Sequence, residues 1–130
     1  MLVEPATFLR RLTEDFHQAG GEFEIREFND RADVLSLEEP VIFNCTGLGA
    51  KALFGDEELT PVKGQLVFMP PDPAVDYLTI GGGQGLLYMF SRSYAIVLGG
   101  TYKEDDWTVH VEPDETTRIV DEHQRIFSGF

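Results

Sequence analysis

The chain has 130 residues and a formal net charge of −13, a negative field that repels phosphate backbones and anionic lipids and so disfavours nucleic-acid and membrane partners. Its composition, with 42% hydrophobic and 12% aromatic residues, is that of a folded globular protein of one domain. A single cysteine, Cys45, excludes an internal disulfide, and no apolar stretch has the length of a signal peptide or membrane span, so a reducing, cytoplasmic setting is expected.

The first part of the chain has the pattern of an α/β winding. Apolar residues three and four apart predict an amphipathic helix over residues 5–19. Residues 22–28 alternate apolar and charged side chains, as a half-buried strand does. A polar connection over 29–39, with one helical turn, leads to the apolar segment 41–43, which is typical of a buried parallel strand.

The rest of the chain predicts an antiparallel sheet followed by a helix. Four short strands are expected at residues 65–69, 77–80, 86–90 and 94–98, separated by Pro, Gly and Ser residues. A second amphipathic helix begins at Pro113 and carries one apolar face, formed by Ile119, Val120, His123, Ile126 and Phe127. The predicted fold class is α+β with a mixed sheet, in which a helix and short parallel strands precede an antiparallel sheet and a C-terminal helix.

Residues 40–54 have the order of a cofactor-binding turn, in which a strand is followed by glycines and a helix start. An apolar strand ends in Asn-Cys-Thr, turns through Gly47 and Gly49, and resumes as a helix start. That arrangement suits a phosphate or a cofactor edge, because glycine lets backbone N–H groups approach and a helix N-terminus favours negative charge. The full G-x-G-x-x-G fingerprint is absent. By themselves the glycines are explained equally well by a tight strand-to-helix turn.

Other candidate sites have simpler explanations. The three histidines are far apart and the cysteine has no partner, so no metal site is expected. His123 shares an apolar helix face and is predicted to be a packing residue. The acidic runs at 56–58 and 104–106 indicate solvated surface. Cys45 is better explained as a small apolar residue at a strand end than as a nucleophile, because no base is placed beside it. No catalytic residue is assigned.

Several motifs in order resemble the D-amino-acid oxidase family of FAD-dependent oxidoreductases. They are N-C-T-G-L-G at 44–49, L-T-P-V-K-G-Q at 59–65, Tyr88, L-G-G at 98–100 and D-W at 106–107, preceded by E-P-A-T-F-L at 4–9. The resemblance implies an FAD cofactor that takes a hydride from the α-carbon of a D-amino acid and then passes electrons to oxygen, forming peroxide. It implies a hydrogen bond from Tyr88 to the substrate carboxylate. It implies cofactor contacts at Cys45, Thr46, Gly47, Lys63, Gly64 and Gln65.

The resemblance covers a central portion of the family's pattern. The G-x-G-x-x-G motif and the family's carboxylate-clamping arginine have no counterpart in these 130 residues, and Lys63 stands where the family more often has arginine. Residues 1–55 then match part of the FAD-domain winding and residues 56–130 the substrate-domain sheet and helix, within one domain over 1–130.

Two functions are open at this point. In the first, the chain is a portion of a D-amino-acid oxidase, inactive in isolation, which acts on a D-amino acid or related amine once missing parts complete it. In the second, it is a non-enzymatic remnant that self-associates through the former FAD-domain interface. Exposed strand edges and apolar faces predict a homo-oligomer or a complementing chain in either case.

Overall fold

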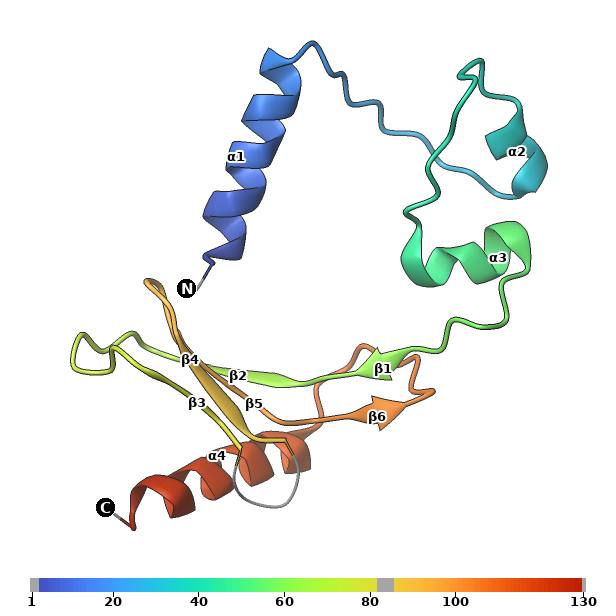
Figure 1. The fold of residues 1–130 in the computed structure, drawn as a ribbon. Coiled ribbons are helices and arrows are strands. Elements are labelled where there is room, and N and C mark those ends of the chain that lie inside the picture. Colours follow the sequence, from blue (N-terminus) through green and yellow to red (C-terminus); the bar gives the residue numbers. More distant parts are fainter. Residues whose placement is uncertain (1–2, 82–85, 130) are drawn as a thin grey trace. The chain divides into compact units, whose positions relative to one another are not determined.

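The computed structural model describes residues 3–81 and 86–129 and divides into two compact units, Met1–Thr60 and Pro61–Phe130. Figure 1 shows the elements of both units as a ribbon. The first holds three helices and a 3₁₀ turn, and the second holds the six strands and the last helix of the described chain. The fold class is therefore α+β, as the sequence predicted.

Helix α1, Pro5–Gln18, is the predicted amphipathic helix. Pro5 occupies the first turn, where a missing N–H is tolerated. The helix ends in two backbone hydrogen bonds, from Gly20 N to His17 O and from Gly21 N to Phe16 O, each 2.9 Å long. That pattern satisfies carbonyls that a helix end would otherwise leave unpaired. Its apolar residues are exposed, so α1 does not bury its apolar face within its own unit.

The remaining helical segments of the first unit are short. Helix α2, Arg31–Leu35, is the predicted helical turn, and its N-cap Asp30 accepts a hydrogen bond of 2.9 Å from Asp33 N. The 3₁₀ turn η1, Gly47–Gly49, leads directly into α3, Ala50–Phe54. The helix start after the glycines is thus confirmed.

The predicted short parallel strands are wrong. Neither residues 22–28 nor residues 41–43 belong to a strand, and every strand pair among the described residues is antiparallel. Ile25 is 104% exposed and Phe43 is 86% exposed. Alternating apolar and charged residues, or a run of apolar residues, indicate which side chains would be buried if a sheet formed. A strand also needs a neighbouring strand to accept and donate its backbone hydrogen bonds. The part of the chain that the structure describes offers these segments none.

The second unit is built on a four-stranded antiparallel sheet in the order β2-β5-β4-β3. Its strands are β2 Leu66–Met69, β3 Leu78–Ile80, β4 Tyr88–Ser91 and β5 Ile96–Gly99, which confirms the four predicted strands to within a few residues. A two-stranded sheet, β1 Val62–Lys63 and β6 Lys103–Glu104, was not predicted. Helix α4, Pro113–Phe127, lies against one face of the four-stranded sheet (Figure 1).

The core of the second unit lies between α4 and the two central strands. Met89 of β4 and Ile96 and Leu98 of β5 pack with Ile119 of α4, which is 0% exposed. Because side chains alternate along a strand, this packing places Tyr88 and Gly99 on the opposite face of the sheet. The sheet therefore has one face covered by α4 and one face that α4 does not cover.

Candidate functional site

Tyr88, the predicted substrate residue, lies at the start of β4 on the face away from α4. It is half-buried and pairs in register with Gly99 on one side and Ile80 on the other. Its ring centroid is 5.2 Å from that of Phe90, which lies two residues along the same strand. The ring is therefore held among sheet residues rather than extended into solvent.

The face around Tyr88 is apolar and largely exposed. We call it the open sheet face; it comprises the side chains that alternate away from α4 on β2, β3 and β4 and is formed by Leu66, Phe68, Leu78, Ile80, Tyr88 and Phe90. Phe68 is 58% exposed and Ile80 is 65% exposed. Contiguous apolar surface of this kind marks a place where a protein meets a ligand or another protein surface.

Lys63, a predicted cofactor residue, is instead bound within the second unit. Its ammonium donates to Glu112 Oε1 at 2.7 Å and to Thr108 Oγ1 at 2.8 Å, and lies 3.5 Å from Asp106 Oδ2. The Lys63 side chain is only 10% exposed. Lys103 donates to the second oxygen of the Glu112 carboxylate. Lys63 of the P-V-K-G-Q motif, together with Lys103, thus joins β1 and β6 to the start of α4.

The charges of this network perturb one another. Hydrogen bonds from Lys103 and then from Lys63 hold the pKa of the Glu112 carboxyl below its usual range. The hydrogen bond to Glu112 raises the pKa of the Lys63 ammonium, against the opposing effect of burial. Hydrogen bonds from Thr108 and the nearby Lys63 charge lower the pKa of Asp106. All these groups are held in their charged forms, which suits a structural cluster better than a proton-transfer site.

Gln65, the third residue of that motif to be predicted as a cofactor contact, caps α4. Its side chain is nearly buried, at 8% exposed. Nε2 donates to Glu112 O at 3.0 Å and to Thr116 Oγ1 at 2.7 Å, while Oε1 accepts from Glu112 N at 2.8 Å. Glu112 is the N-cap of α4 and supplies no side-chain cap of its own. Between Lys63 and Gln65, Gly64 is exposed, and a Cβ there would meet only Thr101 O, at 3.5 Å.

Cys45, Thr46 and Gly47, the predicted flavin-edge residues, lie in the first unit and are exposed. Thr46 donates from both N and Oγ1 to Asn44 Oδ1, at 3.2 and 2.7 Å. Gly47 has φ +55, a conformation that glycine adopts without strain. The segment is a turn closed by its own Asn44 side chain, with its outer surface accessible.

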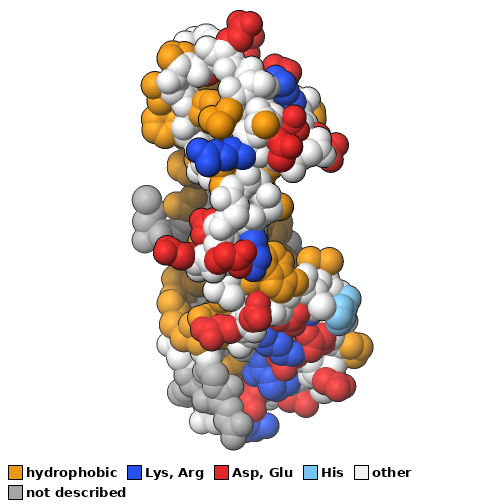
Figure 2. Space-filling model, turned by 90° about the vertical axis from the view of Figure 1, so that its right-hand side faces the viewer, with side chains coloured by type: hydrophobic (Ala, Val, Ile, Leu, Met, Phe, Trp, Pro, Cys, Tyr) orange, Lys and Arg blue, Asp and Glu red, His pale blue; other side chains and the backbone are white. Residues whose placement is uncertain are grey.

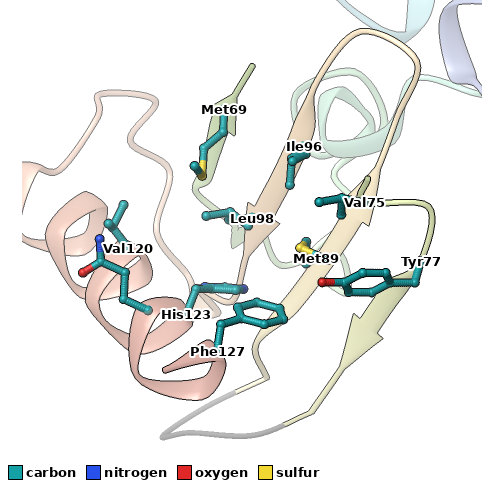
Figure 3. A pocket seen from close by; sticks show the side chains of 10 residues that line it. Met69, Val75, Tyr77, Met89, Ile96, Leu98, Val120, His123 and Phe127 are labelled. Carbon is teal, nitrogen blue, oxygen red and sulfur yellow. The ribbon is translucent and has the colours of Figure 1, made fainter. Parts of the chain in front are cut away.

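A cavity of about 360 Å³ lies on the other side of the sheet from Tyr88. Figure 3 shows Met89, Ile96 and Leu98 pointing into it from the sheet, Phe127 and His123 from α4, and Tyr77 from the segment before β3. His123 is 4% exposed, with Nδ1 2.7 Å from Ile119 O and Nε2 3.2 Å from Tyr88 O. This burial agrees with its predicted packing role. Tyr88 does not line the cavity.

The charged surface follows the composition. Figure 2 shows Asp and Glu side chains spread over the drawn face, with Lys and Arg side chains lying among them. Within residues 3–81 and 86–129, no three His, Cys, Asp or Glu side chains are grouped so as to hold a metal ion. In the same residues no helix has the length and apolar character that crossing a bilayer requires.

Comparison with known proteins decides the family. Residues 1–130 match the DAO family of FAD-dependent oxidoreductases. The chain belongs to this family. Family members depend on FAD, so the resemblance seen in the motifs is confirmed, and so is FAD as the cofactor of the family.

Individual relatives of this chain agree with the family match. A D-amino-acid oxidase from Streptomyces coelicolor is 34% identical over 121 residues, which cover 92% of this chain and 37% of the relative. A D-amino-acid oxidase from Rubrobacter xylanophilus is 33% identical, over 89% of this chain and 35% of the relative. A human D-aspartate oxidase is 34% identical over 62% of this chain and 23% of its own length. The chain thus spans about a third of the length of the bacterial relatives it matches.

Within the second unit, the side chains of Lys63 and Gln65 do not fit a flavin. The side chains of Lys63 and Gln65 are engaged with α4 and its N-cap, so their polar atoms do not face a ligand. Cys45, Thr46 and Gly47 are accessible but belong to the other unit. The structure therefore gives Lys63 and Gln65 of the motif at 61–65 an architectural role in this family member.

Sequence reasoning missed the residues that organise the second unit. Glu112 was not among the residues singled out from the sequence, yet it binds Lys63, Lys103 and Gln65. The available signal was weak, since an N-cap position without Ser, Thr, Asp or Asn suggests that another side chain supplies the cap. Gly99, opposite Tyr88, carried a clearer signal, because glycine inside a strand often marks a close approach by another group.

Proposed function

We propose that this chain is the substrate-facing portion of a D-amino-acid oxidase, in which the Tyr88 hydroxyl binds the substrate carboxylate. The observation that carries the proposal is the position of Tyr88 on the open sheet face, at the start of the central strand β4 and beside exposed apolar side chains. A tyrosine hydroxyl on an apolar surface fits a ligand with one anionic end and an apolar remainder. The family membership and the bacterial relatives support the same reaction class.

The chain alone is proposed to have no oxidase activity. A phenol hydroxyl provides one hydrogen bond to a carboxylate, whereas tight carboxylate binding usually relies on a bidentate arginine. In the second unit Arg118 is bound to Glu115 and Gly100, Arg125 is bound to Glu122, and the Arg92 guanidinium lies over the Phe90 ring, 5.5 Å from its centroid. The polar side chains of the 61–65 motif are also engaged elsewhere. Substrate and flavin binding would then both need groups that these residues do not offer.

Titration with FAD tests this part of the proposal. The purified chain is mixed with FAD, and bound flavin absorbance and peroxide production from D-alanine are measured. We expect no stoichiometric flavin complex and no peroxide above the rate of free FAD. A yellow complex with one FAD per chain would contradict the proposed inactivity.

A chimera tests the role of Tyr88. Residues 1–130 replace the matching segment of the Streptomyces coelicolor D-amino-acid oxidase, which supplies the rest of the enzyme. Tyr88→Phe removes one hydrogen bond to a charged group and should raise KM for D-alanine about tenfold or more. Tyr94→Phe is the matched control, since Tyr94 is exposed and lies in the turn between β4 and β5. Equal KM values for the two variants, at equal flavin content, would contradict the assignment.

A second function, a non-enzymatic module that self-associates, is favoured by the exposure of the open sheet face. Phe68→Lys places a charge on that face and should dissociate an assembly formed through it. Because the chain carries a net charge of −13, an added lysine reduces overall repulsion, so dissociation would not be a net-charge effect. Val109→Lys, at an exposed loop position, is the control for light scattering. A chain that is monomeric at all concentrations would exclude this function.

A further inference from the structure

We infer that the glycine pair Gly99–Gly100 is a seat that positions Tyr88, which makes both glycines positioning residues for the carboxylate-binding hydroxyl. The inference deepens the proposed function and rests on it for the role of Tyr88. The geometry of the seat itself is independent of any ligand. It involves β4, β5 and α4, all within the second unit.

Gly99 is the residue on which the Tyr88 ring packs. Tyr88 and Gly99 are direct partners in the register of β4 and β5. A Cβ on Gly99 would lie within 3.0 Å of Cε2, Cζ and Oη of Tyr88, closer than real Cβ atoms come to other atoms. The tyrosine ring therefore lies across the backbone of β5, with its hydroxyl above Gly99. Any side chain at position 99 would have to displace the ring.

Gly100 packs closely against the two residues that precede Tyr88. A Cβ there would lie 2.7 Å from Leu86 O and 2.8 Å from Leu87 Cδ2, in the residues that enter β4. Its φ of +140 is also one that side-chain-bearing residues rarely adopt. The Gly100 carbonyl accepts a hydrogen bond of 2.8 Å from Arg118 Nη2 on α4. The second glycine thus fixes where the chain turns into β4, directly before Tyr88.

Tyr88 is also confined on its other sides. The Phe90 ring, tilted by 42°, stands 5.2 Å away along the same face. On the α4 side, His123 Nε2 lies 3.2 Å from Tyr88 O, and the next residue, Met89, is buried in the core. The backbone of Tyr88 is therefore held from the α4 face while its ring is held on the open face.

The arrangement has a functional consequence. Glycine in a strand is destabilising by about 0.5–1 kcal/mol relative to alanine, so Gly99, the last residue of β5, needs a reason. An aromatic ring laid across a strand glycine recovers part of that loss by covering it. The same contact fixes the hydroxyl in one place, and positional errors of about 1 Å in a binding group can reduce catalysis about a hundredfold.

A double-mutant cycle in the full 130-residue chain tests the seat. Gly99→Ala and Tyr88→Ala are made singly and together, and urea denaturation gives the unfolding equilibrium constant of each. Gly99→Ala should raise this constant about tenfold, as overpacking does, because the new Cβ collides with the ring. In the Tyr88→Ala background the same change should have no effect or lower the constant. Gly64→Ala is the matched glycine control, since its Cβ would meet only Thr101 O at 3.5 Å.

Nuclear magnetic resonance provides the signature that a general loss of stability would not. In the unmodified chain the Gly99 Hα protons lie under the Tyr88 ring and should be shifted upfield, with nuclear Overhauser contacts to the ring protons. Tyr88→Ala should abolish the shift, and Gly64→Ala should preserve it. This measurement does not require Gly99→Ala to fold.

The inference would be refuted if Gly99→Ala changed the unfolding equilibrium constant equally with Tyr88 and with Ala at position 88. It would also be refuted if the Gly99 Hα chemical shift were not moved upfield. Neither result depends on flavin or substrate. A confirmed seat together with a failed Tyr88→Phe test in the chimera would instead refute the proposed substrate role while leaving the geometry intact.

Discussion

Replacing Gln65 by methionine tests whether the P-V-K-G-Q motif is architectural. Methionine keeps the length and much of the volume of glutamine but removes the amide. The substitution deletes three hydrogen bonds, to Glu112 O at 3.0 Å, from Glu112 N at 2.8 Å, and to Thr116 Oγ1 at 2.7 Å. A thioether sulfur is too weak an acceptor to replace them.

The expected loss follows from these contacts. An intramolecular hydrogen bond contributes about 1 kcal/mol net, and more when a buried partner is left unpaired. Thr116 Oγ1 keeps its own bond to Glu112 O at 3.2 Å, so part of the network survives. Gln65→Met should therefore lower the free energy of unfolding of the second unit by about 2–3 kcal/mol. For a unit of this size the melting temperature should fall by about 10–20 °C.

Urea denaturation followed by circular dichroism measures the effect. Gln124→Met is the matched control, because Gln124 is exposed on α4 and its amide forms no hydrogen bond with another residue that the structure describes. The control should unfold like the unmodified chain. If Gln65→Met were no less stable than Gln124→Met, the side chain would not cap α4, and a role for Gln65 in facing a ligand would regain support.

Three further predictions concern single groups. Because the pKa of Glu112 is lowered in the folded chain, its contribution to stability is present above the ordinary carboxyl pKa and is lost as pH falls through the folded value. Between neutral pH and about pH 3 the unmodified chain should therefore lose more stability than the Glu112→Gln variant. Parallel profiles of stability against pH for the two chains would refute this. Ile119 is 0% exposed, so Ile119→Ala should lower the free energy of unfolding by about 2–5 kcal/mol and Ile119→Val by about 0.5–1.5 kcal/mol, whereas equal urea midpoints would show that α4 is not packed on the sheet. Cys45 is exposed and should react with one equivalent of dithionitrobenzoate at a similar rate with and without urea, and strong protection in the native chain would contradict its position.

The local pattern of the sequence was sufficient for elements whose partners lie nearby in the chain or whose periodicity is strong. Helices α1 and α4 follow from apolar residues three and four apart, and β4 and β5 follow from short apolar runs joined by a tight polar turn. The family followed from motif order, since several matches in sequence are more specific than one glycine turn. These helices, strands and motifs depend on residues close together in the sequence, so they could be predicted without knowledge of distant contacts.

Only the tertiary structure decided which segments pair and which way the motif residues face. The runs at 22–28 and 41–43 have the composition of strands but find no ladder partner in the described chain, because strand formation depends on a second segment that periodicity does not report. Gln65 meets its partner Glu112 across 47 residues of sequence, and Tyr88 lies on Gly99 because the register of two strands places them opposite each other. The sequence by itself thus determined the local elements and the family, while long-range pairing decided that Lys63 and Gln65 hold a helix and that Tyr88 stands on the open sheet face.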